Sequence, residues 1–348
     1  MNSEQERESA LKQWVGEVLQ QSVTLTRRAG DAGFRRYYAI DAVPELLAVD
    51  APPTTENTSQ FMQVAELLRG AGVSVPAIRA FDISCGFVLV ENFGRREFGA
   101  ELDGESALML YGEALFTLLA IAQAPAKPDV LPVFDEAFIL RELGLFSEWF
   151  VGALLGLTLS ADEVAMLDTV FGRLVARALA QPQVVMHRDF HSRNLLAKAD
   201  GSLGVIDFQD AVVGPVTYDL ASLLRDCYVR LPPAEVRRWA LAYGDMALDA
   251  GIMTRVSADD FLCDFDWVGL QRHIKVLGIF ARLHLRDGKS NYLPDLPRVI
   301  GYVQEVADQY PELQDFAAWF RARVVPACEA QSWYCPQPPF DVDVRSLL

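Results

Sequence analysis

The chain has 348 residues, 51% of them hydrophobic, so it can bury one large core or two medium ones. Its 47 acidic and 31 basic residues give a net charge of −16, which argues against a general nucleic-acid-binding or anionic-membrane surface. The five cysteines are widely spaced and include no CxxC pair, so we expect reduced thiols and not a disulfide framework or zinc ribbon.

The N-terminal segment 1–12 is polar and charged, unlike a signal peptide. The most apolar stretches, such as 114–122, are too short to span a bilayer. We therefore expect a cytoplasmic protein that does not bind membranes.

The first 95 residues are expected to form an α+β lobe with an antiparallel sheet. Apolar periodicity and turn residues predict a helix over 4–20, strands over 22–26, 34–40 and 46–49, a helix over 57–69 and a buried strand over 87–90. The turn between the first two strands contains Gly30 and Gly33. An isolated GxxG is more often a simple hairpin turn, but at this place its amides are expected to contact phosphates.

Residues 96–348 are expected to form a larger, mostly helical lobe. Helices are predicted over 104–123, 135–155, 161–181, 217–230, 233–250, 258–286 and 294–325, with an irregular segment over 325–344. Two β-rich runs, 184–186 and 203–208, are expected to form a small hairpin. The whole pattern predicts an α+β, two-lobed protein-kinase-like fold with its active site between the lobes.

Two motifs carry the chemistry. The octapeptide His-Arg-Asp-Phe-His-Ser-Arg-Asn at 187–194 contains Asp189 and Asn194, and Gly-Val-Ile-Asp-Phe at 204–208 contains Asp207. Phosphoryl transfer to a hydroxyl needs one carboxylate for the proton of the attacking group. It also needs an amide oxygen and a second carboxylate for the metal ion. We therefore predict a small-molecule kinase, with Asp189 as general base and Asn194 and Asp207 as Mg²⁺ ligands.

These motifs, with the run Gly-Asp-Ala-Gly-Phe-Arg-Arg-Tyr-Tyr at 30–38 and Asp-Ala-Pro-Pro at 50–53, resemble the aminoglycoside phosphotransferase-like kinases. Within that family the chain is most similar to the bacterial anomeric sugar kinases of peptidoglycan recycling. The resemblance implies ATP as phosphoryl donor and C1 of N-acetylmuramate or N-acetylglucosamine as acceptor. No nucleic acid, membrane or obligate protein partner is implied.

The resemblance also implies roles for residues outside the catalytic triplet. Backbone groups of Glu91, Asn92 and Phe93, where the lobes connect, are expected to bind adenine. His187 is expected to be a structural hydrogen-bonding centre, and Asp219 is expected to fix the catalytic loop from the start of the next helix.

One departure from the family pattern concerns the phosphate clamp. Kinase-like folds use a lysine on the third strand, but this chain has no lysine between Lys12 and Lys127. Arg35 and Arg36 alternate in direction on a strand, so one of them can face the cleft, and we favour Arg36. A solvent-facing charge is an equally good interpretation. The carboxylate partner is Glu56 or Glu66, and the sequence does not decide between them.

The acceptor site is predicted from residues close in sequence to the catalytic motifs. Arg225 suits a lactyl carboxylate, and acidic and aromatic side chains suit sugar hydroxyls and the sugar ring. The remaining predicted acceptor residues are His191, Asp210, Asp226, Tyr228 and Trp149. Residues 225–228 are expected to lie on the helix that begins near Asp219. Surface salt bridges and core aromatics are at least as good an interpretation for each of them.

Three alternatives stay open. The first is another acceptor in the same family, such as an aminoglycoside, choline or a related amino alcohol. The second is a nucleotide-binding pseudokinase, which the missing lysine suggests. The third is a zinc hydrolase, since His187, Asp189 and His191 form an H-x-D-x-H pattern.

Overall fold

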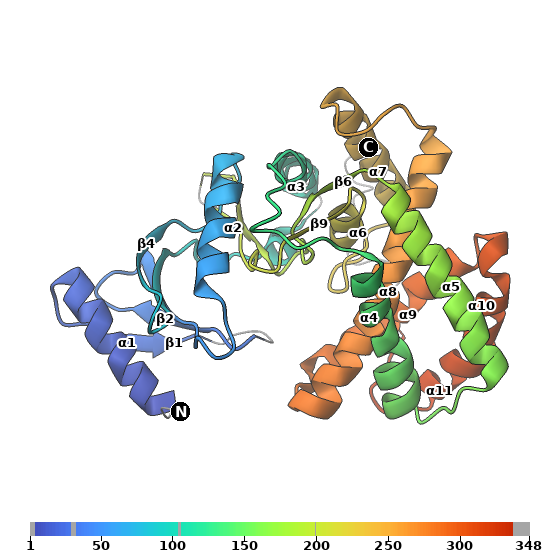
Figure 1. Cartoon of the computed structure of the whole chain (residues 1–348), viewed down its shortest axis with the longest axis horizontal. Helices are drawn as coiled ribbons and strands as arrows, with labels where there is room; N and C mark the ends of the chain where they lie inside the picture. The colour runs from blue at the N-terminus through green and yellow to red at the C-terminus, as the bar shows by residue number, and fades with distance from the viewer. Residues whose placement is uncertain (1–3, 29–32, 104–105, 199, 337–348) are drawn as a thin grey trace.

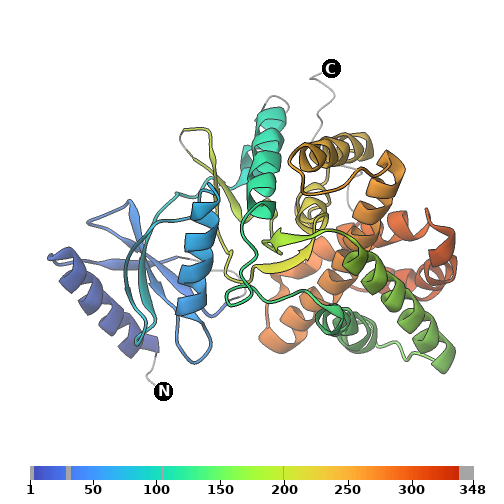
Figure 2. The ribbon, with the colours of Figure 1, turned by 45° about the horizontal axis from the view of Figure 1, so that its top comes forward.

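The computed structural model describes residues 4–28, 33–103, 106–198 and 200–336 and arranges them in two lobes. The N-terminal lobe lies at one end of an elongated molecule and the helical lobe at the other (Figure 1). A second view keeps the same separation, with α2 (Thr58–Gly70) on the side of the N-terminal lobe nearer the helical lobe (Figure 2). This is the predicted architecture. The exact lobe boundary, at residue 95, stays a prediction.

The N-terminal lobe contains one five-stranded antiparallel sheet in the order β1-β2-β3-β5-β4. Its strands are β1 (Leu25–Arg27), β2 (Arg36–Ile40), β3 (Leu46–Asp50), β4 (Ile78–Asp82) and β5 (Phe87–Glu91). Four of them were predicted. Strand β4 was missed because its residues alternate between half-buried and exposed at the edge of the sheet, so no apolar run marks it.

Helices cover both faces of this sheet. Phe87 and Leu89 pack with α1 (Glu4–Leu19), whereas Val88 and Val90 belong to the core that includes α2. Successive side chains of a strand point to opposite faces, so residues 87–90 of β5 are all apolar because both faces are buried there. Helix α2 begins after Asn57, whose side chain accepts the Gln60 amide at 3.0 Å.

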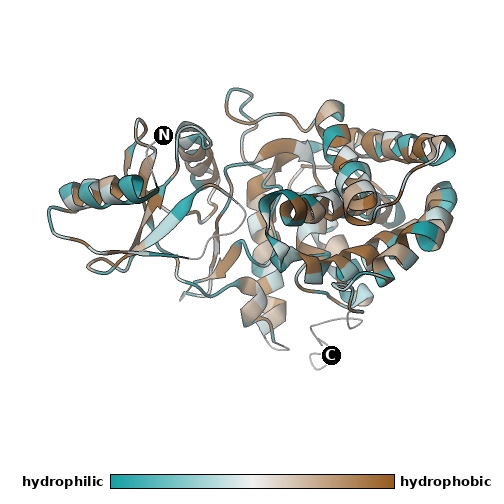
Figure 3. Cartoon of the chain, turned by 90° about the horizontal axis from the view of Figure 1, so that it is seen from below, coloured by the Kyte–Doolittle hydropathy of each residue, from teal (hydrophilic) through white to brown (hydrophobic). Residues whose placement is uncertain are grey.

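The C-terminal lobe is built around the 30-residue helix α8 (Ala258–Asp287). Around it pack α4 (Glu136–Leu145), the π-helical η2 (Phe146–Leu154), α5 (Ala161–Ala180), α6 (Tyr218–Leu224), α7 (Pro233–Asp249) and α9 (Leu296–Ala307), and α3 (Ser106–Ala122) packs on α6 and α7. Gly278 allows η2 to approach α8, because a Cβ there would lie 2.4 Å from the carbonyl carbon of Leu145. Brown and teal residues alternate along these helices, as amphipathic packing requires (Figure 3).

Several predicted helices are shorter than expected. The segment 217–230 is helical only to Leu224, so residues 225–228 follow α6 and do not lie on it. The segment 294–325 is interrupted after α9, where Pro311 begins a short 3₁₀ turn. The remaining elements are η1 (Phe98–Glu101), η3 (Ser290–Asp295), η4 (Pro311–Leu313), α10 (Gln314–Trp319), η5 (Phe320–Val324) and α11 (Val325–Glu329). Helix α11 replaces part of the predicted irregular C-terminus, and residues 337–344 lie outside the described part.

Two small sheets frame the catalytic octapeptide. Strand β6 (Gln183–Met186) pairs with β9 (Val212–Pro215), and β7 (Leu195–Ala197) pairs with β8 (Leu203–Val205). The predicted pairing of β6 with β8 is therefore wrong, although both strands exist. The catalytic loop connects β6 to β7, and Asp207 follows β8.

All five cysteines are free thiols. Within the described ranges, no helix combines the length and apolar character needed to cross a bilayer.

Candidate active site

The carboxylate of Asp219 holds the start of the catalytic loop in place. Its two carboxylate oxygens accept the backbone amides of His187 and Arg188, the latter at 2.9 Å. His187 Nε2 donates to the carbonyl of Ile206 at 2.9 Å, and its Nδ1 accepts the Asp189 amide at 3.3 Å. The imidazole thus ties the octapeptide to the second motif. Burial raises the pKa of Asp219 to about 6.

Asp226 fixes the other end of the loop. Its carboxylate accepts the amide of Ser192 at 2.8 Å and that of Tyr228 at 2.9 Å, and the side chain is almost fully buried. Asn194 donates from Nδ2 to the Asp189 carbonyl at 2.9 Å, which leaves its amide oxygen available. The loop backbone is therefore determined at several points.

That bonding sustains an unusual backbone. Arg188 and Asp207 have φ angles of 76° and 61°, in the left-handed region that non-glycine residues rarely adopt. Such residues cost on the order of 1–3 kcal/mol each and cluster at functional sites. Each of the two catalytic motifs contains one such residue, which supports a functional role for both motifs.

Asp189 lies in a strongly cationic environment. Burial alone would raise its pKa, but the charges of Lys275, Arg188, His191 and Arg272 outweigh burial and hold the pKa well below its usual range. Lys275 and Arg188 also share a carboxylate, that of Glu142, at 3.7 and 2.6 Å. Asp189 is therefore ionised at any physiological pH.

Asp207 has the opposite character. Solvent reaches its side chain. Even so, the surrounding protein partly desolvates the carboxylate and, together with the negative charges of Asp189 and Asp210, raises its pKa to about 6. Gln209 donates to its Oδ1 at 2.7 Å. A free amide oxygen on Asn194 and a carboxylate under negative charge form a hard-oxygen donor set, which fits a divalent cation such as Mg²⁺.

The two candidate arginines of the phosphate clamp point in opposite directions. Arg35 is buried, lies 3.0 Å from Glu56 and covers the ring of Phe61 at 4.9 Å. Arg36 meets Asp50 at 2.9 Å and Glu4 of α1 at 3.5 Å, on the far face of the sheet. The prediction of Arg36 is thus corrected by the alternation of the strand, which turns its guanidinium away from the site.

Arg35 also belongs to the neighbourhood of the second motif. The rings of Phe61 and Phe208 are stacked, with centroids 5.0 Å apart, and the charge of Arg35 lowers the pKa of Asp207. Of the two glycines in the loop before it, Gly33 is described and Gly30 lies outside the described residues. The geometry therefore favours Arg35, with Glu56 as its partner.

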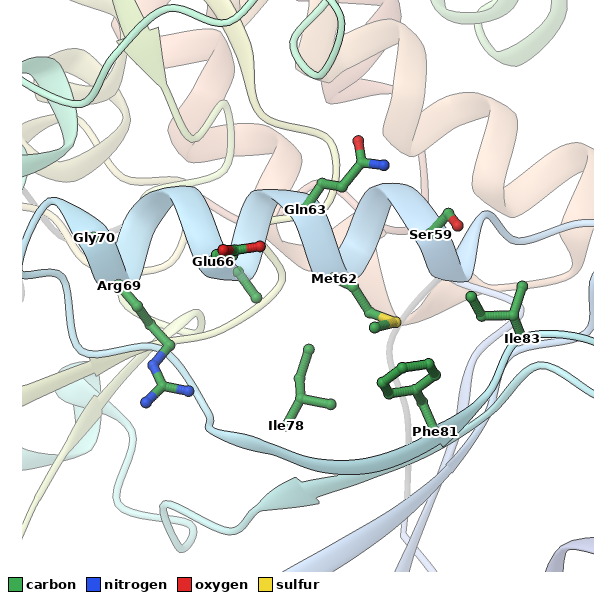
Figure 4. A pocket seen from close by; sticks show the side chains of 10 residues that line it. Ser59, Met62, Gln63, Glu66, Arg69, Gly70, Ile78, Phe81 and Ile83 are labelled. Atoms are coloured by element: carbon green, nitrogen blue, oxygen red, sulfur yellow. The ribbon is translucent and has the colours of Figure 1, made fainter.

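Glu66, the other candidate partner, lies elsewhere. It is exposed on α2 and lines a pocket of about 620 Å³ between α2 and β4, together with Met62, Ile78 and Phe81 (Figure 4). All residues that line this pocket belong to the N-terminal lobe, and none is part of the catalytic triplet.

The segment that connects the lobes is hydrogen-bonded to neighbouring backbone of the N-terminal lobe. The amides of Glu91 and Asn92 already donate to the carbonyls of Ala77 and Glu45, at 2.9 and 2.8 Å. The predicted contact of adenine with this segment is therefore restricted to its carbonyls and the amide of Phe93. The Phe93 ring packs directly on Gly204, where a Cβ would lie 2.3 Å from it.

The structure corrects two predicted acceptor residues. Arg225 pairs through Nη2 with Asp266 of α8 and lies over the ring of Phe265 at 4.7 Å, so its guanidinium is directed to α8. Asp226 is almost fully buried, and each of its carboxylate oxygens accepts a backbone amide of the loop, so it braces the loop and does not face a sugar. Both errors follow from the early end of α6, which redirects these side chains.

The other predicted acceptor residues are placed as follows. His191 and Tyr228 lie together, with ring centroids 5.2 Å apart. The negative charge of Asp210 helps to raise the pKa of Asp207 and of Glu56. Trp149 packs half-buried on the core of the helical lobe. Their contacts with an acceptor stay predictions.

The zinc-hydrolase alternative lacks support. His187 uses both ring nitrogens within the protein. Within the described ranges, no three His, Cys, Asp or Glu side chains gather in a way that could hold a metal ion.

Sequence reasoning missed the buried cations behind Asp189. Arg272 and Lys275 are almost fully buried on α8. A polar run, Gln-Arg-His-Ile-Lys at 271–275, in the middle of an apolar helix was the available signal.

The sequence model of the phosphotransferase enzyme family matches residues 24–255. The chain is 41% identical to an N-acetylmuramate/N-acetylglucosamine kinase of Pseudomonas putida over 84% of this chain and 86% of that protein. It is 38% identical to the kinase of the same name from Neisseria meningitidis, over 88% and 93% of the two chains.

Solved structures share the fold. An ADP-bound aminoglycoside phosphotransferase, APH(2'')-Ib, superposes with a TM-score of 0.58 at 15% identity, over 86% of this chain and 99% of that one. The choline kinase LicA from Streptococcus pneumoniae superposes with a TM-score of 0.60 at 16% identity, over 86% and 99% of the two chains.

Proposed function

Since the chain belongs to the phosphotransferase enzyme family, we propose that it is an ATP- and Mg²⁺-dependent kinase for the anomeric hydroxyl of N-acetylmuramate and N-acetylglucosamine. The observation that carries the proposal is the extended similarity to kinases of that name, about 40% identity over most of both chains. The reaction would serve the reuse of cell-wall sugars in the cytoplasm.

Asp189 is proposed to receive the acceptor hydroxyl. Its depressed pKa keeps it ionised, so it accepts a hydrogen bond from the hydroxyl at any working pH. A weak base suits a loose transition state, because the hydroxyl becomes acidic only as its bond to phosphorus forms. Asp189 therefore orients the nucleophile first and takes the proton late.

Asn194 and Asp207 are proposed to hold the Mg²⁺ that accompanies ATP. The amide oxygen of Asn194 is not used by its hydrogen bond to the Asp189 carbonyl, and the carboxylate of Asp207 lies near the negative charges of Asp189 and Asp210, which a bound cation would offset. When bound, Mg²⁺ neutralises the charge that the phosphates bring to the site.

Arg35 is proposed to replace the missing lysine. It is held by Glu56 and by the ring of Phe61, so its guanidinium is oriented before nucleotide binds. Guanidinium suits phosphate because its planar donors can contact two oxygens at once.

The test is direct. We expect purified protein with ATP and Mg²⁺ to convert both sugars to products whose ³¹P resonance is lost on mild acid treatment, as for an anomeric phosphate. An acid-stable product from an aminoglycoside or choline in the same acceptor panel would instead favour that acceptor. ATP binding without turnover on any acceptor would favour a pseudokinase.

A further inference from the structure

One cation of the catalytic loop is only loosely engaged. Arg193 lies between Ser192 and Asn194, and its side chain is 33% exposed. Its Nη2 is 3.8 Å from the carboxylate of Asp295, too far for a hydrogen bond. Arg188 and Arg225, by contrast, are at hydrogen-bond distance from Glu142 and Asp266 and are less exposed, at 15% and 14%.

The orientation of Arg193 is nevertheless fixed. Its guanidinium carbon lies 3.6 Å above the centroid of the Tyr228 ring, a close cation–π contact. Tyr228 in turn stacks on Phe280, whose ring contacts Tyr292 at 5.0 Å. A planar cation lying flat on an aromatic ring keeps the edge of its donor fork free for a ligand.

This surface adjoins the catalytic carboxylate. The His191 ring packs edge-on against Tyr228, with ring centroids 5.2 Å apart. Burial lowers the pKa of His191, and the nearby carboxylates of Asp226 and Asp189 oppose that shift. His191 is nine-tenths buried, and its Nδ1 has no hydrogen-bond partner among the residues that the structure describes. A buried polar atom without a partner calls for a ligand or water.

Resting on the proposed function, we infer that Arg193, stacked on Tyr228, recognises the carboxylate of the acceptor's lactyl ether. N-acetylmuramate carries this carboxylate at C3, where N-acetylglucosamine has a hydroxyl. In the absence of substrate, the nearest carboxylate to Arg193 is that of Asp295, at 3.8 Å. Arg193 is thus a specificity-determining residue.

The experiment compares kcat/KM for the two sugars at saturating ATP in the full-length protein. We expect Arg193→Met to lower the N-acetylmuramate to N-acetylglucosamine ratio by about tenfold or more, the usual size for a charge-assisted hydrogen bond. Arg193→Lys should recover part of the ratio, since it keeps the charge but not the planar fork. Arg225→Met is the matched control and should leave the ratio unchanged.

An equal loss for both sugars, or no loss for either, would overturn the inference. A variant-free measurement uses the wild-type enzyme at rising salt concentration. The KM for N-acetylmuramate should rise with salt, whereas that for the uncharged sugar should not, and parallel behaviour also overturns the inference. A wild-type enzyme that phosphorylates neither sugar overturns the proposed function, and this inference with it.

Discussion

The guanidinium of Arg35 lies 3.0 Å from the carboxylate of Glu56, at the entrance to the second catalytic motif. Arg36, its neighbour in sequence, belongs to a different group of charges with Asp50 and Glu4. Two adjacent residues of one type thus serve the two faces of the same sheet. The pair offers a matched test of the phosphate clamp.

We expect Arg35→Ala to raise the KM for ATP by about ten- to a hundredfold, because it removes charge-assisted hydrogen bonds of about 1.5–3 kcal/mol. Arg36→Ala should leave the KM for ATP near its native value. It should instead lower Tm, since it takes one partner from the fully buried Asp50.

Steady-state kinetics and thermal unfolding of both variants check this prediction. The opposite pattern, a high KM for ATP in Arg36→Ala and a native KM in Arg35→Ala, would show that Arg36 and not Arg35 binds the phosphates.

Removing the charge of Asp189 tests its role as base. Asp189→Asn keeps the shape of the side chain and the backbone bonds of the loop, so nucleotide binding should be preserved. We expect kcat to fall by about 10²–10⁴-fold, the usual contribution of a positioned acid or base. Nucleotide titration and single-turnover kinetics separate the two effects. A variant with near-native turnover would exclude Asp189 from proton transfer.

The parts of the site that local sequence determines could be predicted. Asp189, Asn194 and Asp207 belong to two short motifs, and a few residues of loop bring them together in any chain that forms the flanking strands. In the structure, Nδ2 of Asn194 donates to the carbonyl of Asp189, five residues earlier in the same loop.

What could not be predicted depends on where an element ends. Helix α6 stops at Leu224 because Asp226 captures the Tyr228 amide, a side-chain bond that competes with the helix. That early stop directs Arg225 to α8 and Asp226 to the catalytic loop. Arg193 was overlooked because its partner, Asp295, lies 102 positions further along the sequence.

The role of Asp226 as a loop brace gives a separate prediction. Asp226→Ala leaves one buried and one partly buried amide without acceptors, and the buried one alone costs about 1–3 kcal/mol, so Tm should fall clearly. Turnover should fall for every acceptor alike, because the loop loosens as a whole. Asp226→Asn keeps one acceptor oxygen and should be intermediate. If Asp226→Asn instead raised only the acceptor KM at native Tm, the residue would contact the sugar.

The raised pKa of Asp207 predicts a pH dependence of Mg²⁺ and nucleotide binding. Above pH about 6 the carboxylate is ionised, and below it a proton occupies the site that the cation needs. For the metal-free protein the sign is also defined. A carboxyl group with a raised folded-state pKa lowers stability as pH rises from its unfolded value, near 4, to about 6. Mg²⁺ should reverse that loss at neutral pH.

We therefore expect Mg²⁺ with ADP to raise Tm much more at about pH 7.5 than at about pH 5, where protons compete with the cation. Asp207→Asn controls for protonation of the nucleotide itself, since that titration is common to both proteins. The difference in ΔTm between wild type and variant should shrink as pH falls through about 6. A difference that is constant across this range would mean that Asp207 does not bind the ion.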